Sequence, residues 1–250
     1  MELQKILVPL AKADNEYQLI QDGDKIAIGV SGGKDSMLLL TALAMYSKFK
    51  NKNFQIIAIH VSVGFPGMDF SEVESFCDSL SIPFYSLKTE IYDILKLYKK
   101  DDKLECSLCA KLKKGAIIKE AKRLGCNKLA FAHHGDDAIE TLLLNMIHGA
   151  RFATFPASMY LTREDITFIR PLIYCFEADI ITAMNDNKIP FVVSTCPNDG
   201  HTQRQEMKEL LDNIYKQYPQ AHSNFLKALH NHKQMELWNE MIRLPKDSQN

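Results

Sequence analysis

The sequence has no excess of charge of either sign and no long hydrophobic run. Its 250 residues contain 30 Lys and Arg and 31 Asp and Glu, a formal net charge of −1, which argues against nonspecific nucleic-acid binding over the whole surface. The longest apolar stretch, residues 37–46, is interrupted by Thr41 and is too short to span a bilayer. Residues 1–5 do not resemble the start of a secretory signal. We therefore expect a cytoplasmic protein without a membrane partner.

Cysteine pairs are also scarce. Only Cys106 and Cys109 stand close together, and a four-cysteine zinc site would need a second close pair. Six cysteines in a reducing compartment favour ligands, redox groups or core side chains over disulfides. Three of them have apolar neighbours in expected elements and should fill the core: Cys77, Cys126 and Cys175.

Strand-like and helix-like segments alternate along the chain, which predicts an α/β fold with a doubly wound, mainly parallel sheet and helices on both faces. After a first strand near residues 26–30, strands are expected at 54–63, 83–88, 128–132, 166–173 and 191–193. Helices are expected at 3–20, 37–45, 71–80, 91–100, 106–124, 138–148, 177–187 and in the tail. We divide the chain into an N-terminal helix (1–22), one main domain (23–200) and a helical C-terminal tail (201–250).

The first strand leads into a loop that is suited to phosphate. It is called the phosphate loop below and consists of Ser31, Gly32, Gly33, Lys34, Asp35 and Ser36. Unpaired amides at the following helix start, two glycines, two hydroxyls and a lysine make an anion site. The loop is not a Walker A motif, because Ile28 and Asp35 occupy positions that need Gly and Ser or Thr. It matches the S-G-G-x-D-S loop of N-type ATP pyrophosphatases; the alternative is a turn that only joins strand to helix.

The pair Cys106-Ser-Leu-Cys109 opens an expected helix, where the positive end of the dipole should lower the thiol pKa. A CxxC motif alone fits a dithiol redox pair, half of a zinc site or part of an iron–sulfur site. Cys196 follows the last expected strand and is predicted to reach the same edge of the sheet. Three cysteines would leave one metal position open for chemistry.

Two aspartates follow the fourth expected strand, after His133 and His134. Either Asp136 or Asp137 could cap the next helix, while the other holds Mg²⁺ or transfers a proton. The two histidines are equally consistent with structural hydrogen bonds.

The helix after the CxxC motif is rich in lysine and arginine: Lys111, Lys113, Lys114, Lys119, Lys122 and Arg123. A solvated helix face explains them, and so does a phosphate-backbone contact surface or, for Lys113, an inward catalytic role. Gln203 and Arg204 could reach a nucleotide or simply begin the tail helix.

Taken in order, these motifs resemble the tRNA 2-thiocytidine synthetase (TtcA) family of PP-loop ATP pyrophosphatases. The matching stretches, which lie between about residues 20 and 220, are Ser31–Ser36, Cys106–Cys109, His133–Asp137, Thr141–Asn145, Ile169–Leu172, Cys196 and Gln203–Gln205. The resemblance implies a [4Fe–4S] cluster on Cys106, Cys109 and Cys196, with one iron lacking a protein ligand. It also implies ATP and Mg²⁺ at the phosphate loop, with His60 and Val61 near the nucleotide.

The activity implied by the resemblance is AMP-forming activation of C2 of a tRNA cytidine, position 32 in the family, followed by replacement of oxygen with sulfur. Asp137, Asp136 and Lys113 are then candidates for catalysis, and a sulfide or cysteine-desulfurase persulfide is the expected sulfur donor. Family members commonly form homodimers. Three alternatives stay open: a paralogue that thiolates another nucleoside or a small molecule, an amine-using ATP pyrophosphatase, and a non-catalytic nucleic-acid-binding protein with structural zinc.

Overall fold

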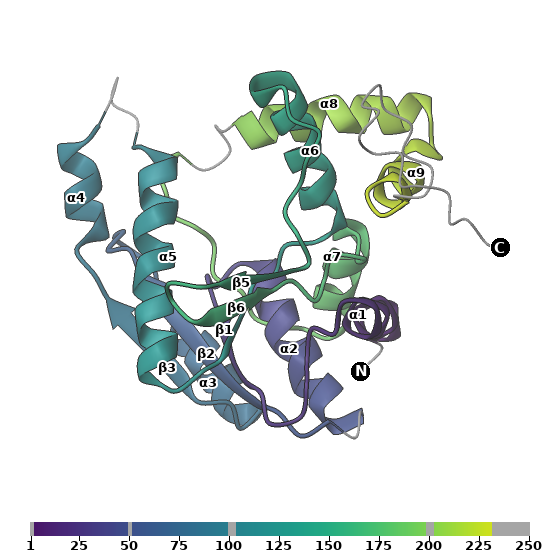
Figure 1. Ribbon diagram of the computed structural model, residues 1–250. Helices are drawn as coiled ribbons and strands as arrows, with labels where there is room; N and C mark the ends of the chain where they lie inside the picture. Colours follow the sequence, from purple (N-terminus) through teal and green to yellow (C-terminus); the bar gives the residue numbers. More distant parts are fainter. Residues whose placement is uncertain (1–2, 50–51, 100–103, 199–202, 232–250) are drawn as a thin grey trace.

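The computed structural model describes residues 3–49, 52–99, 104–198 and 203–231. Its centre is a six-stranded sheet of order β3-β2-β1-β4-β6-β5, parallel except at the β5–β6 edge. The strands are β1 (Lys25–Gly29), β2 (Gln55–Ser62), β3 (Phe84–Lys88), β4 (Lys128–Ala130), β5 (Ser158–Leu161) and β6 (Ile166–Ile169). The predicted doubly wound α/β fold is confirmed (Figure 1).

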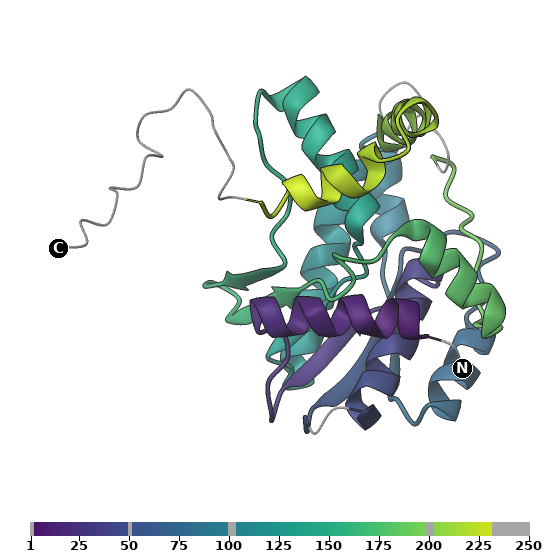
Figure 2. The ribbon, with the colours of Figure 1, turned by 90° about the vertical axis from the view of Figure 1, so that its right-hand side faces the viewer.

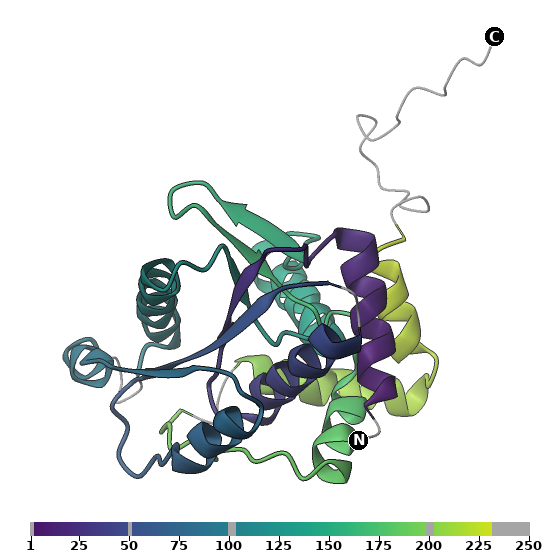
Figure 3. The same cartoon turned by 90° about the horizontal axis from the view of Figure 1, so that it is seen from below.

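Helices cover both faces of the sheet, as Figure 3 shows from below. One face carries α1 (Gln4–Tyr17), α2 (Lys34–Phe49), α3 (Ser71–Ser79) and α7 (Glu177–Asp186), and the other carries α5 (Cys106–Arg123) with α4 (Ile91–Leu97) beside it. Alternation along β1 explains this: Ile26 and Ile28 point into the core with α1 and α2, whereas Ala27 points toward α5.

Three helices project beyond the carboxyl ends of the parallel strands (Figures 1 and 2). They are α6 (Gly135–Gly149), α8 (Gln203–Gln217) and α9 (Ala221–Ala228). Ile139 of α6, Met207 and Leu211 of α8, and Leu226 of α9 form a small separate core. The predicted helical tail therefore packs on α6 as far as it is described; residues 232–250 lie outside the described chain.

Two strand predictions were wrong. Residues 191–193 form no strand; their Val192 amide donates to Gly32 O (2.8 Å) instead of joining a ladder. The edge strand β5, Ser158–Leu161, was missed, because four partly exposed residues are too few to reveal their alternation in the sequence and the strand depends on antiparallel pairing with β6. The three core cysteines, by contrast, are buried as predicted: Cys77, Cys126 and Cys175.

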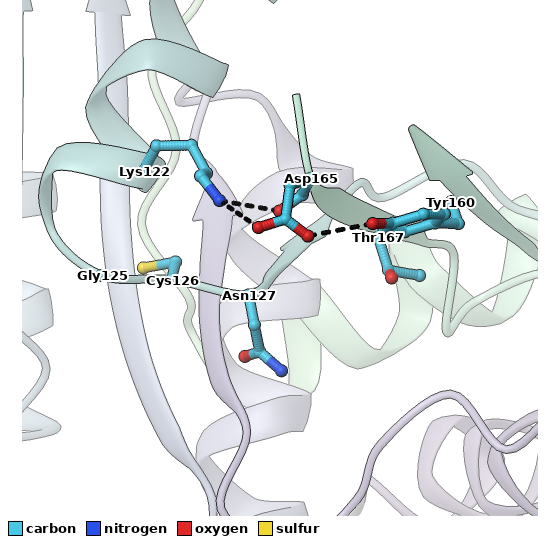
Figure 4. Close-up of a pocket in the computed structure, with 7 residues that line it drawn as sticks. All are labelled: Lys122, Gly125, Cys126, Asn127, Tyr160, Asp165 and Thr167. Atoms are coloured by element: carbon cyan, nitrogen blue, oxygen red, sulfur yellow. Dashed lines mark hydrogen bonds and ion pairs between the residues drawn. The ribbon is translucent and has the colours of Figure 1, made fainter. Parts of the chain in front are cut away.

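The described helices include none that is both long and apolar enough to cross a membrane. A polar pocket of about 390 Å³ lies at the amino ends of β4 and β6, where Lys122 bonds to Asp165 and Asp165 accepts from Tyr160 (Figure 4). This pocket is at the opposite edge of the sheet from the phosphate loop.

Candidate functional site

The phosphate loop connects β1 to α2, and its own side chains hold it in shape. Ser36 Oγ donates to Gly33 O (2.8 Å) and lies 3.1 Å from Ser31 Oγ, which accepts from the Gly33 amide (3.3 Å). Gly32 has φ +86°, a conformation that favours glycine. The loop therefore presents backbone amides at the start of α2, where an anion binds well.

Side chains from other parts of the chain pack against the phosphate loop at Gly32. A Cβ on Gly32 would lie 2.7 Å from Phe70 Cε1 and 3.1 Å from Val192 Cβ. The Phe70 ring stacks on His60, with centroids 3.7 Å apart, and His60 Nδ1 donates to Val30 O at 2.9 Å. Burial lowers the pKa of His60, so its imidazole is neutral and carries the Nδ1 proton that this bond requires. His60 and Val61 both line the cleft described below.

Lys34 belongs to a chain of alternating charges. Its Nζ lies 3.1 Å from Asp35 Oδ1 and 2.9 Å from Glu177 Oε1, and Glu177 Oε2 accepts from Lys208 of α8 at 2.6 Å. Burial opposes the charged form of Lys34, but the hydrogen bond to Glu177 and the charge of Asp35 raise its pKa overall. Lys34 is therefore a fixed cation at the start of α2.

The two aspartates after β4, Asp136 and Asp137, point in different directions. Asp137 Oδ2 accepts from the backbone amide of His134 (3.0 Å) and faces the cleft. Asp136 turns away, accepting from the Glu177 amide (2.7 Å) and from His222 of α9. The N-cap residue of α6 is His134, so neither aspartate is itself the N-cap.

Arg204, at the start of α8, reaches back to α6. Its Nη1 lies 2.8 Å from Glu140 Oε2 and 3.4 Å from Asp137 Oδ1. Arg204 thus pairs with carboxylates of α6 and stands in the first turn of the tail helix, as one of the two sequence interpretations predicts; its contact with a nucleotide stays a prediction.

The cysteines of the CxxC motif occupy the first turn of α5. Cys106 is exposed, whereas Cys109 and Cys196 are half-buried. Asn198 Nδ2 donates to Leu104 O (2.6 Å) and to Cys106 Sγ (3.3 Å), which ties the segment after Cys196 to the start of α5.

The predicted lowering of the thiol pKa at this helix start is wrong for Cys109. Burial raises the pKa of the Cys109 thiol, and the positive charge of Lys113 only partly opposes this. The neighbouring Cys196 and Cys106 thiols raise it further when charged. The three sulfurs are thus close enough to interact electrostatically.

The phosphate loop and the cysteine segments line one common cleft of about 1180 Å³. Its lining includes the phosphate-loop residues other than Gly32, and also Cys109, Cys196, Lys113 and Asp137. Five of the lining residues are lysine or arginine and two are aspartate, although the whole chain has a net charge of −1. The cleft is therefore suited to polyanionic substrates.

The donor atoms favour particular metal centres. Among the described residues, no three His, Cys, Asp or Glu are placed to hold a single metal ion. The three cysteines offer thiolates, which are the ligands that an iron–sulfur cluster takes. Asp35 Oδ1 is buried at the phosphate loop and makes no hydrogen bond, although Lys34 Nζ lies 3.1 Å away as an ion pair; such a carboxylate oxygen fits a ligand of Mg²⁺.

Four residues that the sequence did not single out individually belong to the site: Arg170, Glu177, Lys208 and His222. Arg170 lines the cleft, and the others link α7, α8 and α9 to the phosphate loop or to Asp136. Sequence periodicity carries no signal for such contacts, because the partners are 31 to 143 residues apart.

Comparison with known proteins agrees with this geometry. The PP-loop domain family matches residues 3–214. A tRNA-cytidine(32) 2-sulfurtransferase of Pelobacter propionicus is 40% identical over 224 residues, covering 89% of this chain and 83% of the relative. One from Coxiella burnetii is 34% identical over 242 residues, covering 94% of each.

A solved structure, the U34-tRNA thiolase NcsA from Methanococcus maripaludis with its [4Fe-4S] cluster, superposes with a TM-score of 0.71. It is 21% identical and covers 93% of this chain and 80% of that one, so the likeness concerns the fold. The resemblance inferred from the motifs is confirmed by the family match and by the identity to the curated relatives. The chain belongs to the PP-loop family and, within it, to the tRNA-cytidine(32) 2-sulfurtransferase family.

Proposed function

We propose that the protein uses ATP to replace O2 of a tRNA cytidine, position 32 as in its relatives' name, with sulfur. The observation that carries this proposal is the shared cleft, in which the phosphate loop and two of the three candidate ligand cysteines face one space. A carbonyl oxygen is a poor leaving group, and adenylation converts it into AMP, which leaves easily. The activating and sulfur-delivering groups must therefore reach the same carbon atom.

ATP binds with its phosphates at the phosphate loop and its adenosine near His60 and Val61. Cytidine O2 attacks the α-phosphorus, and the bond to the β-phosphate breaks. The loop amides and Lys34 hold the departing pyrophosphate, and their fixed positive charge stabilises the negative charge that develops. Asp35 and Asp137 would hold Mg²⁺, which would supply further charge neutralisation at the phosphates.

Sulfur then adds to C2, and the C2–O2 bond breaks as AMP leaves with the oxygen atom. Cys106, Cys109 and Cys196 would hold a [4Fe–4S] cluster, which would bind and deliver the sulfide. Asp137 takes up or delivers a proton at the reacting base, and Lys113, one turn after Cys109, stabilises the adduct. Asp136 acts by positioning His134, not by contact with the substrate.

The sulfur comes from free sulfide, or from a cysteine-desulfurase persulfide whose outer sulfur is reduced to sulfide by an external thiol with formation of a disulfide. The protein acts in the cytoplasm as a homodimer. These parts of the proposal rest on the resemblance and on the reduced state that exposed thiols require.

The test is anaerobic purification, followed by iron and sulfide analysis and by mass spectrometry of nucleosides after incubation with tRNA, ATP and sulfide. We expect about four irons per chain, ATP-dependent 2-thiocytidine, and loss of both in Cys109→Ser. Ser107→Ala, between the two cysteines, is the matched control and should retain both.

A colourless protein without a cluster after reconstitution would contradict the proposal. Full activity of Cys109→Ser with an amine in place of sulfide would favour an amine-using ATP pyrophosphatase. Stoichiometric zinc, with no AMP formed on any RNA, would favour a structural zinc protein.

A further inference from the structure

Arg170 follows the carboxyl end of β6 and lines the cleft, yet no carboxylate in the described part of the chain pairs with its charge. The residue is 8% exposed, its Nη1 donates to Pro156 O at 2.7 Å, and its Nε is buried without a hydrogen bond. Arginine stays protonated in proteins. A buried cation with an unused donor costs folding free energy unless a ligand completes its hydrogen bonds.

One aromatic ring lies against this guanidinium and begins a row of three rings. It lies 4.9 Å from the centre of the Phe155 ring, which is 5.0 Å from His133, and His133 lies 6.0 Å from Phe131. Burial lowers the pKa of His133 to about 4, so the imidazole is neutral at neutral pH; its Nδ1 is also buried without a hydrogen bond. Rings beside unused polar atoms are typical of a site that receives an unstacked base.

The position of Arg170 in the sheet separates it from the nucleotide. The phosphate loop follows β1, and His60 and Val61 lie on β2, on one side of β1. Arg170 follows β6, which is on the other side and separated from β1 by β4. An ATP molecule whose adenosine lies near β2 leaves the β6 side of the cleft for the second substrate.

We propose that Arg170 is a specificity-determining residue that donates a hydrogen bond to N3 of the target cytosine. The inference rests on the proposed function. N3 of cytosine is an acceptor, whereas N3 of uracil carries a hydrogen and is a donor. Uracil would place two donors face to face and leave the buried arginine unsatisfied, so the site rejects it. Arg170 also draws electron density away from C2, the atom that is attacked.

The experiment measures ATP-dependent thiolation of anticodon stem-loops that carry cytidine, uridine or 3-deazacytidine at the target position. For the wild type, loss of N3 in 3-deazacytidine should lower kcat/KM by roughly 10- to 100-fold, the range for a charged hydrogen bond. Arg170→Gln offers an amide oxygen that accepts from uracil, so it should lose most of the preference for cytidine over uridine and should not respond to the deaza substitution. Its KM for ATP should be unchanged.

The matched control is Arg163→Gln, an exposed arginine in the turn between β5 and β6, which should behave as the wild type. If Arg170→Gln is poorly folded, binding to the wild type without ATP decides, because the reactivity of C2 does not enter it: the stem-loop with 3-deazacytidine should bind less tightly than the stem-loop with cytidine, and equal affinities would overturn the inference. An unchanged cytidine preference in folded Arg170→Gln, a higher KM for ATP without a change in base preference, or equal rates on cytidine and 3-deazacytidine would overturn the inference. Failure of the wild type to thiolate any substrate would instead refute the proposed function.

Discussion

Asp136 and Asp137 are adjacent in the sequence but serve different parts of the molecule. Asp137 faces the cleft, while Asp136 binds the start of α7 through the Glu177 amide and α9 through His222, and lies 3.5 Å from His134 Nδ1. Burial alone would raise the pKa of Asp136, but hydrogen bonds from His134, His222 and the Glu177 amide hold it well below its usual range. Asp136 therefore stays charged and fixes the position of three elements around the site.

Asp136→Asn should lower the free energy of unfolding by ~3 kcal/mol near pH 5.5, because it breaks a largely buried ion pair. Because the pKa of Asp136 is lower in the folded chain than the unfolded value near 4, the charged carboxylate stabilises the fold above about pH 4, and this stabilisation is lost as the pH falls. Because the pKa of His134 is higher in the folded chain than the unfolded value near 6.5, the protonated imidazole stabilises the fold below about pH 6.5, and this stabilisation is lost as the pH rises. Urea titrations at pH 5.5 and 8.5 should therefore show the larger loss of unfolding free energy in Asp136→Asn at pH 5.5. Equal losses at the two pH values would contradict an ion pair between Asp136 and His134.

At Gly32 both the backbone conformation and the close packing of neighbouring side chains require a glycine. Gly32→Ala should abolish ATP binding or weaken it at least tenfold, since its Cβ would press on Phe70 and Val192 and displace the phosphate loop. Gly23→Ala is the matched control, because Gly23 also has positive φ (+83°) but has no atom within 4 Å of the added Cβ. Calorimetry of ATP binding to both variants makes the comparison. Equal effects would mean that backbone strain, not the contact with Phe70, determines the loop's shape.

At the scale of elements, α8 connects the tail of the chain to the reaction site. Its charged side reaches the phosphate loop through Lys208 and Glu177 and reaches Asp137 through Arg204, while its apolar side packs on α6 and α9. A displacement of α8 would therefore alter the ion pairs of both Lys34, through Glu177, and Asp137.

Leu211→Ala tests this packing, with Leu210→Ala as its neighbouring control. Leu211 is 3% exposed and Leu210 is 46% exposed. We expect Leu211→Ala to cost about 2–4 kcal/mol of unfolding free energy, and Leu210→Ala less than about 0.5. Thermal unfolding of both variants gives the comparison, and similar losses would show that α8 does not pack as described.

The sequence predicted the elements whose residues carry a local pattern. The phosphate loop, the CxxC helix and the tail helix α8 each depend on residues within a few positions of one another, and all three elements form where expected. The edge strand β5 has four residues and forms by pairing with β6 across a tight turn, so its short pattern did not reveal it. Residues 191–193 have an apolar pattern typical of a strand, but the Val192 amide bonds to Gly32, which is distant in the chain, and no strand forms there.

The same limit applies to the site. Motif spacing identified Cys106, Cys109 and Asp137, but the bridge from Lys34 through Glu177 to Lys208 spans 174 residues of chain and exists only in the fold. The pKa of Cys109 shows a related failure: the helix start predicted a decrease, and burial, which depends on tertiary packing, reverses it. Which buried groups remain without partners, such as Arg170 Nε, is likewise a property of the folded chain.

On the scale of the whole molecule, α5 runs from one edge of the sheet to the other, and its lysines face different surroundings. Lys114 lines the cleft and lies 4.9 Å from the centre of the Phe168 ring. Lys122, near the other end of α5, binds Asp165 at the opposite edge (Figure 4). The chain as a whole is nearly neutral, so only the cleft edge of the sheet should attract RNA.

Lys114→Gln should weaken tRNA binding roughly threefold to tenfold at about 0.1 M salt and reduce the slope of log affinity against log salt by about 1, because one phosphate contact is lost. Lys122→Gln removes the same charge from the same helix and should leave both quantities unchanged, since Lys122 faces away from the cleft. Filter binding at several salt concentrations measures both variants. If the two lysines had equal effects, RNA would be held by the general charge of α5 and not by the cleft edge, and the orientation of the substrate over the carboxyl ends of the strands would be wrong.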